Sequence, residues 1–178
     1  MQNNPKPEVW LRGPLPDIAD ILQPAAHALL QAQEEINAAL ANFPDKLMWE
    51  KPAGVASVAF HLQHLAGVLD RLLTYARQES LSETQLAFLK AEGQPSPDIH
   101  SVHELVEAFN RQVGIALTQL KQTHAQTLTD IRYVGRAMLP STHLGLIFHA
   151  AEHTQRHTGQ LLVTAKILTA EPNHRFQP

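Results

Sequence analysis

Four long segments of this 178-residue chain repeat apolar residues with the period of an α-helix, and this pattern limits the fold more than any other feature. Apart from Pro24, prolines are confined to the ends of these segments and to the connections. Pro24 has no amide hydrogen, so it either kinks the first helix or marks its real start. No segment shows the alternation of apolar and polar residues that is typical of strands. The sequence therefore predicts an all-α four-helix bundle with no sheet, its helices near residues 17–42, 56–77, 101–125 and 142–169.

The connections agree with this fold. Residues 78–100 are expected to form one long crossover, with a helical turn or two around Gln85–Lys90. Ser57 is a plausible N-cap for the second helix, because its hydroxyl can accept a hydrogen bond from a free amide of the first turn. The chain is therefore similar in plan to bundles that have one long crossover connection.

The length is that of one domain, which we expect to cover residues 1–178. Four prolines make residues 1–16 an extended N-terminal segment, in which Trp10 and Leu11 are expected to pack on the body. The bundle then occupies residues 17–169, and a tail follows over residues 170–178.

The composition excludes several classes of function. A net charge of −3, with both signs interspersed, predicts no nucleic-acid partner. No apolar run approaches the length of a membrane span and the N-terminus has no signal-peptide pattern, so we expect a cytoplasmic protein without membrane contact. The chain has no cysteine, which excludes disulfides, thiolate zinc sites and a cysteine nucleophile. Eleven histidines against two tyrosines are the one oddity.

Several of these histidines cluster on two predicted helices. His149, His153 and His157 follow one another at four-residue intervals on the last helix, and His61 and His64 lie on the second. Neutral imidazole is the commonest protein ligand for transition metals, and residues four apart share a helix face. Helical phase favours His153 and His157 as a ligand pair and leaves His149 at the rim. On the second helix, phase mildly prefers His61 to His64.

A competing motif overlaps the last cluster. The segment His149-Ala-Ala-Glu152-His153 formally matches the signature of the inverted zinc peptidases, in which the glutamate is the general base. The match is short, those enzymes are much larger, and phase places Glu152 on the outer side of the helix. We therefore set peptidase chemistry aside.

The whole chain resembles the DinB/YfiT-like superfamily in helix order and spacing. The resemblance lies in Phe60-His61-Leu-Gln-His64-Leu-Ala-Gly on the second helix and His153-Thr-Gln-Arg-His157-Thr-Gly-Gln on the last. In that family one histidine of helix two and two of helix four bind a divalent metal such as nickel or zinc. By position in the motif these are His64, His153 and His157, which leaves His61 as a neighbour of the ligands or a substitute for one. The segment from Trp10 to Pro14 is not a general family feature, so it marks a subgroup or caps the pocket.

The resemblance implies a metal-dependent transferase that uses a low-molecular-weight thiol, or a hydrolase, acting on a small molecule. Three neutral imidazoles leave the metal open positions at which water or a thiol is acidified. With no cysteine of its own, the chain would need the thiol as a cosubstrate. No general base is identifiable, since Glu50, Glu152 and His149 are near the site only in sequence. The alternative is a non-catalytic DinB-like metal-binding or stress-response module.

The family also suggests self-association. Its members are often homodimers, and exposed apolar side chains such as Trp10, Leu11 or Phe88 would suit the core of an interface. The same side chains are equally explained by packing within one monomer. The substrate, the metal used in the cell and the oligomeric state cannot be read from the sequence.

Overall fold

The fold was analysed in a computed structural model, which describes residues 6–170 of the chain. The first five residues of the predicted N-terminal segment, and the predicted tail beyond residue 170, lie outside the described residues. Helices dominate the described part. They are α1 (Gln23–Leu40), α2 (Val58–Ala76), α3 (Glu83–Ala91), α4 (Val102–Gln122) and α5 (His143–Thr169).

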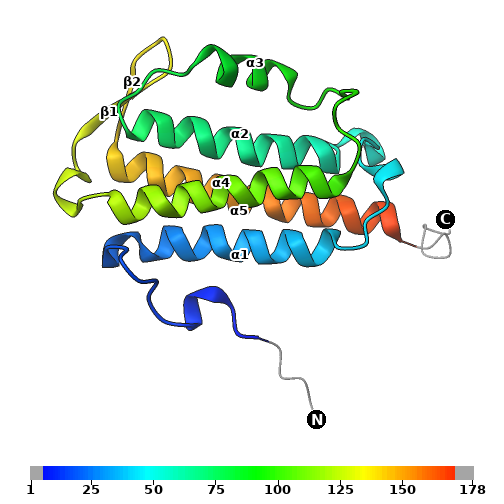
Figure 1. The fold of residues 1–178 in the computed structure, drawn as a ribbon, viewed down its shortest axis with the longest axis horizontal. Helices are drawn as coiled ribbons and strands as arrows, with labels where there is room; N and C mark the ends of the chain where they lie inside the picture. Colours follow the sequence, from blue (N-terminus) through cyan, green and yellow to red (C-terminus); the bar gives the residue numbers. More distant parts are fainter. Residues whose placement is uncertain (1–5, 171–178) are drawn as a thin grey trace.

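The four long helices form a bundle in which helices consecutive in sequence are not always neighbours in space. α1 packs against α4 and α5, and α2 packs against the same two helices (Figure 1). α1 and α2 therefore occupy opposite corners, as do α4 and α5. This arrangement places α2 beside α5 although 85 residues separate their starts along the chain. The predicted all-α four-helix bundle is confirmed.

Local chemistry explains where these helices begin. Pro24 lies in the first turn of α1, so of the two predicted alternatives it marks the start of the helix and does not kink it. The Ser57 hydroxyl accepts a hydrogen bond from the Phe60 amide at 3.2 Å, which confirms the predicted N-cap of α2. Thr142 caps α5 in the same way through the Gly145 amide.

The prediction that the chain has no sheet is wrong in one place. Ile131–Val134 (β1) and Leu139–Thr142 (β2) pair as an antiparallel hairpin between α4 and α5. Strands of four residues are at the lower limit of length at which alternation can be recognised in a sequence. The hairpin is held to the bundle by Arg132, which is buried and whose Nε donates to the Ala76 carbonyl oxygen at the end of α2 at 2.9 Å. This contact supplies a partner for a helix-end carbonyl group.

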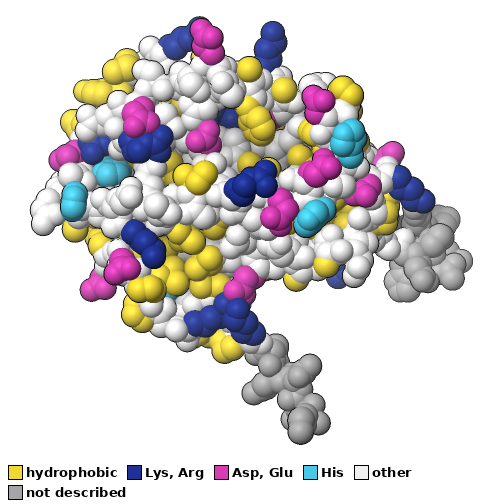
Figure 2. All heavy atoms as spheres, viewed as in Figure 1, with side chains coloured by type: hydrophobic (Ala, Val, Ile, Leu, Met, Phe, Trp, Pro, Cys, Tyr) yellow, Lys and Arg dark blue, Asp and Glu magenta, His cyan; other side chains and the backbone are white. Residues whose placement is uncertain are grey.

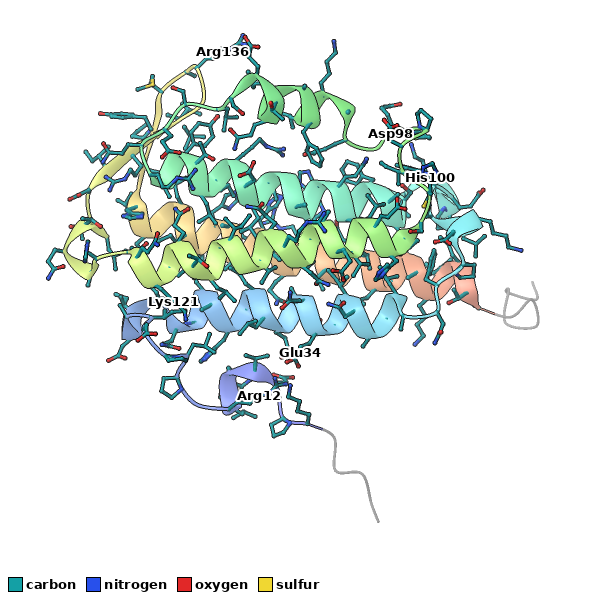
Figure 3. All side chains as sticks on the ribbon, in the orientation of Figure 1. Arg12, Glu34, Asp98, His100, Lys121 and Arg136 are labelled. Atoms are coloured by element: carbon teal, nitrogen blue, oxygen red, sulfur yellow. The ribbon has the colours of Figure 1, made fainter. Side chains whose placement is uncertain are left out.

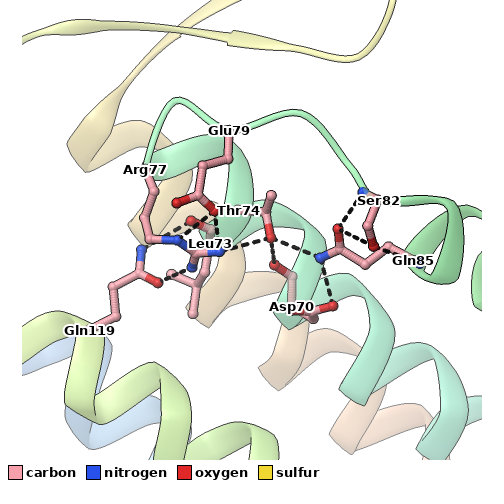
Figure 4. A network of polar contacts seen from close by, with 8 residues as sticks. All are labelled: Asp70, Leu73, Thr74, Arg77, Glu79, Ser82, Gln85 and Gln119. Atoms are coloured by element: carbon pink, nitrogen blue, oxygen red, sulfur yellow. Dashed lines mark hydrogen bonds and ion pairs between the residues drawn. The ribbon is translucent and has the colours of Figure 1, made fainter.

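The short helix α3 in the crossover is fastened along α2. Ser82 and Gln85 form a reciprocal capping box at its start. The Gln85 side-chain amide also donates to Asp70 at 2.7 Å and to Thr74 at 2.8 Å, both on α2 (Figure 4). The predicted helical turns at Gln85–Lys90 are thus confirmed within a slightly longer helix. Because its start is fixed on the second half of α2, the end of α3 reaches the first half, where the α2 histidines lie.

The N-terminal segment lies along α1. Arg12 and Glu34 point toward each other (Figure 3), with guanidinium and carboxylate atoms 2.6 Å apart. The expectation that Trp10 and Leu11 pack on the body is wrong, because both are exposed and the buried side chain is their neighbour Val9. The Val9 amide donates to the Gln31 side chain at 2.9 Å, which turns the backbone so that Val9 faces α1.

The surface gives two further observations. Acidic and basic side chains are interspersed over the face shown in Figure 2, without a patch of one sign. Within residues 6–170, no helix combines the length and the apolar character that crossing a membrane requires. Trp10, Leu11 and Phe88 are all exposed, while their role in a homodimer stays a prediction, as does the single-domain organisation.

Candidate metal centre

Three of the predicted histidines converge between α2 and α5. His64, His153 and His157 each offer a ring nitrogen, and these nitrogens lie within 4.8 Å of one another. The Nε2 atoms of His64 and His153 are 2.9 Å apart. Ligands at about 2.1 Å from one ion are separated by roughly 3 Å when they subtend a right angle, so this spacing suits shared coordination as well as a shared proton. The arrangement could hold a metal ion.

His64 is oriented by a carboxylate that sequence reasoning did not identify. Its Nδ1 lies 2.8 Å from Oε2 of Glu92, the residue that follows α3, and the Glu92 side chain is only 5% exposed. Oε1 of the same carboxylate accepts a hydrogen bond from Arg71 at 2.6 Å. A carboxylate paired with a guanidinium is an acceptor, so the His64 Nδ1 carries the hydrogen. The Nε2 lone pair of His64 is then free to face the other histidines, an orientation typical of metal-ligating imidazoles.

Gly67 provides the space for this contact. A methyl group at its position would lie 2.6 Å from both Arg71 and Glu92 and 2.7 Å from the Phe88 ring. The end of α3 can approach α2 closely only because this position has no side chain. The glycine of the second-helix motif thus has a structural reason, which is to admit the residue that orients His64.

His61 belongs to a different part of the cluster from the one that helical phase predicted. Its side chain is buried, and its Nδ1 lies 3.1 Å from Nδ1 of His157. It is not a member of the converging triad, so the mild preference of phase for His61 is not supported and the position favoured by the motif, His64, joins the group. With its Nδ1 engaged by His61, His157 has its Nε2 left for a ligand.

Burial lowers the pKa of three of these imidazoles, His61, His153 and His157, and so favours their neutral form. Loss of water contact, and then the proximity of His64, lower the pKa of His61 to about 4. The same two causes, joined by His153, lower the pKa of His157 to about 4. Burial also lowers the pKa of His153, with a further contribution from His64. Neutral rings keep the lone pairs that bind metals near pH 7.

One nitrogen in the cluster has no partner among residues 6–170. Nδ1 of His153 is buried and makes no hydrogen bond there, whereas Nδ1 of His64 has Glu92 and Nδ1 of His157 has His61. A buried polar atom without a partner is uncommon and costs free energy. Three imidazoles whose ring nitrogens converge, two of them held in place by neighbours, fit a divalent transition metal.

His149 lies at the rim of the cluster, as predicted. Its ring is half exposed, and Nδ1 donates to Oε1 of Glu152 at 2.6 Å. Arg156 donates to the other oxygen of Glu152 at 2.9 Å. Although partial burial raises it, the hydrogen bond from His149 and the charge of Arg156 leave the pKa of Glu152 below its ordinary value. His149, Glu152 and His153 are also close enough to hold an ion, but Arg156 already occupies the carboxylate.

The structure places each of the candidate general bases that were named from the sequence. Glu152 and His149 bind one another at the rim, and Glu50 is exposed in the connection before α2. Glu92 was missed because it lies 28 residues from His64 in a crossover of irregular pattern. The signal that could have located it is the pair of breaks around it, namely the Ser82–Gln85 capping box before the helix and Gly93 after it.

Comparisons with known proteins agree with the fold. The sequence model of the DinB superfamily matches residues 28–161, which include both histidine segments. A solved structure described as a conserved protein from Enterococcus faecalis superposes with a TM-score of 0.68 at 17% sequence identity. The alignment covers 86% of this chain and 99% of that one, and at this identity it shows the fold alone. No curated protein matches the sequence.

Proposed function

This chain belongs to the DinB superfamily, whose members typically bind a divalent metal, and from this premise we propose that it is a metal-dependent enzyme. His64, His153 and His157 would hold the ion, and the reaction would be transfer of a small electrophile to a low-molecular-weight thiol or to water. The observation that carries the proposal is the convergence of three ring nitrogens from α2 and α5. Nickel and zinc both suit this donor set.

The residues around the cluster support a catalytic ion. Glu92 keeps the hydrogen of His64 on Nδ1, and His61 engages Nδ1 of His157. Among the described residues no carboxylate joins the triad as a fourth ligand, and a site closed by four protein ligands is the mark of a structural metal. When bound, a divalent ion in this setting supplies Lewis acidity that lowers the pKa of a water or thiol.

The thiol, where one is used, would come from outside the protein. The chain has no cysteine, so no side chain of its own can be the sulfur nucleophile. The pair His149–Glu152 lies at the rim of the cluster, on the helix that carries His153 and His157. A non-catalytic metal-binding module remains the competing proposal, and it differs in one respect: it predicts a bound metal without turnover.

Metal retention tests the proposal. After loading with Zn²⁺ or Ni²⁺ and dialysis, the wild-type protein should retain about one ion per chain. His157→Ala should abolish retention because it removes one of three ligands, whereas His149→Ala should leave most of it. Metal content is measured by plasma mass spectrometry, with folding checked by circular dichroism.

A thiol screen on small electrophiles then separates an enzyme from a metal-binding module. Absence of metal under every loading condition, or loss of metal in His149→Ala with retention in His157→Ala, overturns the ligand assignment. Full metal loading with no turnover of any electrophile, with either thiol or water as acceptor, favours the non-catalytic module.

A further inference from the structure

We propose that a pocket along α5 binds a small carboxylate with an apolar tail, and that its charged end lies next to the histidine cluster. That this ligand is the substrate rests on the proposed function. The pocket has a volume of about 640 Å³, within the usual range for small-molecule sites. Its walls come from α5, from the segment that leads into α2 and from the first turn of α2.

One end of the pocket is apolar. Val163 and Ile167 of α5 line it together with Val55, which comes from the connection before α2. All three side chains are about half exposed, at 59%, 52% and 48%. Val163 and Ile167 are four residues apart and therefore share one face of the helix. Exposed apolar side chains gathered in a groove with a polar rim are typical of a binding site.

The other end is polar and borders the candidate metal centre. His61 lines the pocket there, and its Nδ1 is 3.1 Å from Nδ1 of His157. Arg156, one turn of helix from Gln160, is the one charged side chain among the described residues that line the pocket. A single guanidinium nitrogen of Arg156 is used by Glu152, so its other N–H groups can donate to a ligand.

The charge and shape of the pocket identify the class of ligand. A guanidinium binds a carboxylate with paired hydrogen bonds, so the acid group of the ligand belongs at Arg156. From Arg156 to Ile167 the helix advances about 16 Å, at 1.5 Å per residue, which leaves room for an extended apolar tail. In this orientation the acid end, and not the tail, lies beside His61 and the metal centre.

Gly159 allows the pocket to be filled without disturbing the fold. It lines the pocket, and a Cβ at its position would meet no other atom within 4 Å. Gly114 on α4 is equally open but lines a separate groove, so it is a matched control. Replacing a glycine inside a helix by leucine favours the helix, so both Gly159→Leu and Gly114→Leu should fold.

The experiment measures binding of octanoate, octanol and acetate by calorimetry, in metal-free and metal-loaded protein. Octanoate should bind, with octanol and acetate each weaker by about tenfold or more. Gly159→Leu should weaken octanoate by at least about tenfold, and Gly114→Leu should leave it within about twofold. Arg156→Gln should reduce octanoate to the affinity of octanol.

Two results overturn the pocket: octanoate binding that Gly159→Leu does not weaken, or octanol binding as tightly as octanoate. These outcomes are separate from those that test the enzyme. If the protein retains no metal but octanoate binds in the Gly159-dependent way, the proposed function fails and the pocket stands. If metal is retained and octanoate does not bind, the pocket alone is overturned.

Discussion

Two chains of contacts in this protein have the same composition and the same order, His to Glu to Arg. In the first, His64 and Arg71 bind the two oxygens of Glu92. In the second, His149 and Arg156 bind the two oxygens of Glu152. The first joins residues up to 28 positions apart and has side chains no more than 18% exposed. The second spans two turns of α5 and has side chains at least 30% exposed.

This difference in burial explains why the contacts of Glu92 can control the metal site and those of Glu152 cannot. In the exposed chain water can replace any lost partner, and surface ion pairs therefore contribute little. In the buried chain a lost partner leaves a charge or a donor without water, which is costly. The buried carboxylate also determines which nitrogen of His64 carries the hydrogen. The same residue types at similar distances thus differ in burial, and the buried set is the one that contacts His64 of the triad.

Replacing Glu92 should give the largest effect. Arg71 and His64 bind different oxygens of Glu92, and in Glu92→Gln one of these oxygens is replaced by an NH2 group, so one of the two partners would face a donor. If the amide donates to His64, the hydrogen of that ring moves to Nε2 and blocks the metal. We expect metal affinity to fall by about 10- to 100-fold, and Glu92→Ala to cost about 3–5 kcal/mol in the free energy of unfolding. Competition with a chelator and urea denaturation measure the two effects.

The exposed contacts of Glu152 supply the control for the Glu92 variants. Glu152→Gln should change metal affinity by less than about threefold and the free energy of unfolding by no more than about 1 kcal/mol. Nitrogen NMR of the histidine rings should show a changed tautomer of His64 in Glu92→Gln only. Equal losses in the two variants would contradict the importance that we assign to burial.

Adding one methyl group at Gly67 should have the next largest effect. The new Cβ would lie 2.6–2.7 Å from Arg71, Glu92 and the rigid Phe88 ring. On an exposed surface such side chains could move away from a new methyl group, but Arg71 and Glu92 are buried and bound to each other. We expect Gly67→Ala to lower the free energy of unfolding by about 1–3 kcal/mol and to weaken metal binding.

Gly114→Ala is the matched control, because no atom lies within 4 Å of its new Cβ. It should stabilise the protein by about 0.5–1 kcal/mol. Urea denaturation of both variants measures the difference. A Gly67→Ala variant as stable as Gly114→Ala would mean that α3 does not need its close approach to α2.

The local features of this comparison were accessible to sequence reasoning, and the buried chain was not. Helical period predicted the four long helices to within about six residues at each end, and helical phase placed His149 at the rim. Each of these features depends only on residues of a single helix. Contacts between α2 and α5 depend on which helices become neighbours, and α1 and α2, though consecutive, lie at opposite corners.

The errors have the same origin. The hairpin of β1 and β2 depends on a contact between Arg132 and the end of α2, which no local pattern reveals. Phase preferred His61 because it lies closer to the centre of the apolar face, and that is why it is buried. The ring that contacts His153 is that of His64, which is less buried than His61. A residue at the centre of the apolar face of α2 packs into the core, whereas a residue at the edge of that face can reach α5.

An exposed contact away from the site should give the smallest effect and sharpens the rule about burial. Hydrogen bonds from Arg12, and then from Lys6, lower the pKa of Glu34 to about 2, although its side chain is 40% exposed. A carboxyl group whose pKa is lower in the folded state stabilises the fold above its ordinary pKa of 4.5, and that contribution is lost as the pH falls toward 2.

We expect Glu34→Gln to lower the Tm at pH 7 by less than about 3 °C, because exposed pairs are weak. The difference from the wild type should shrink between about pH 5 and pH 3 in thermal denaturation. Glu35→Gln, which removes the same charge one residue away from the Arg12 pair, is the matched control. A loss of stability in Glu34→Gln as large as that in Glu92→Ala would refute the rule that burial decides which of these pairs matters.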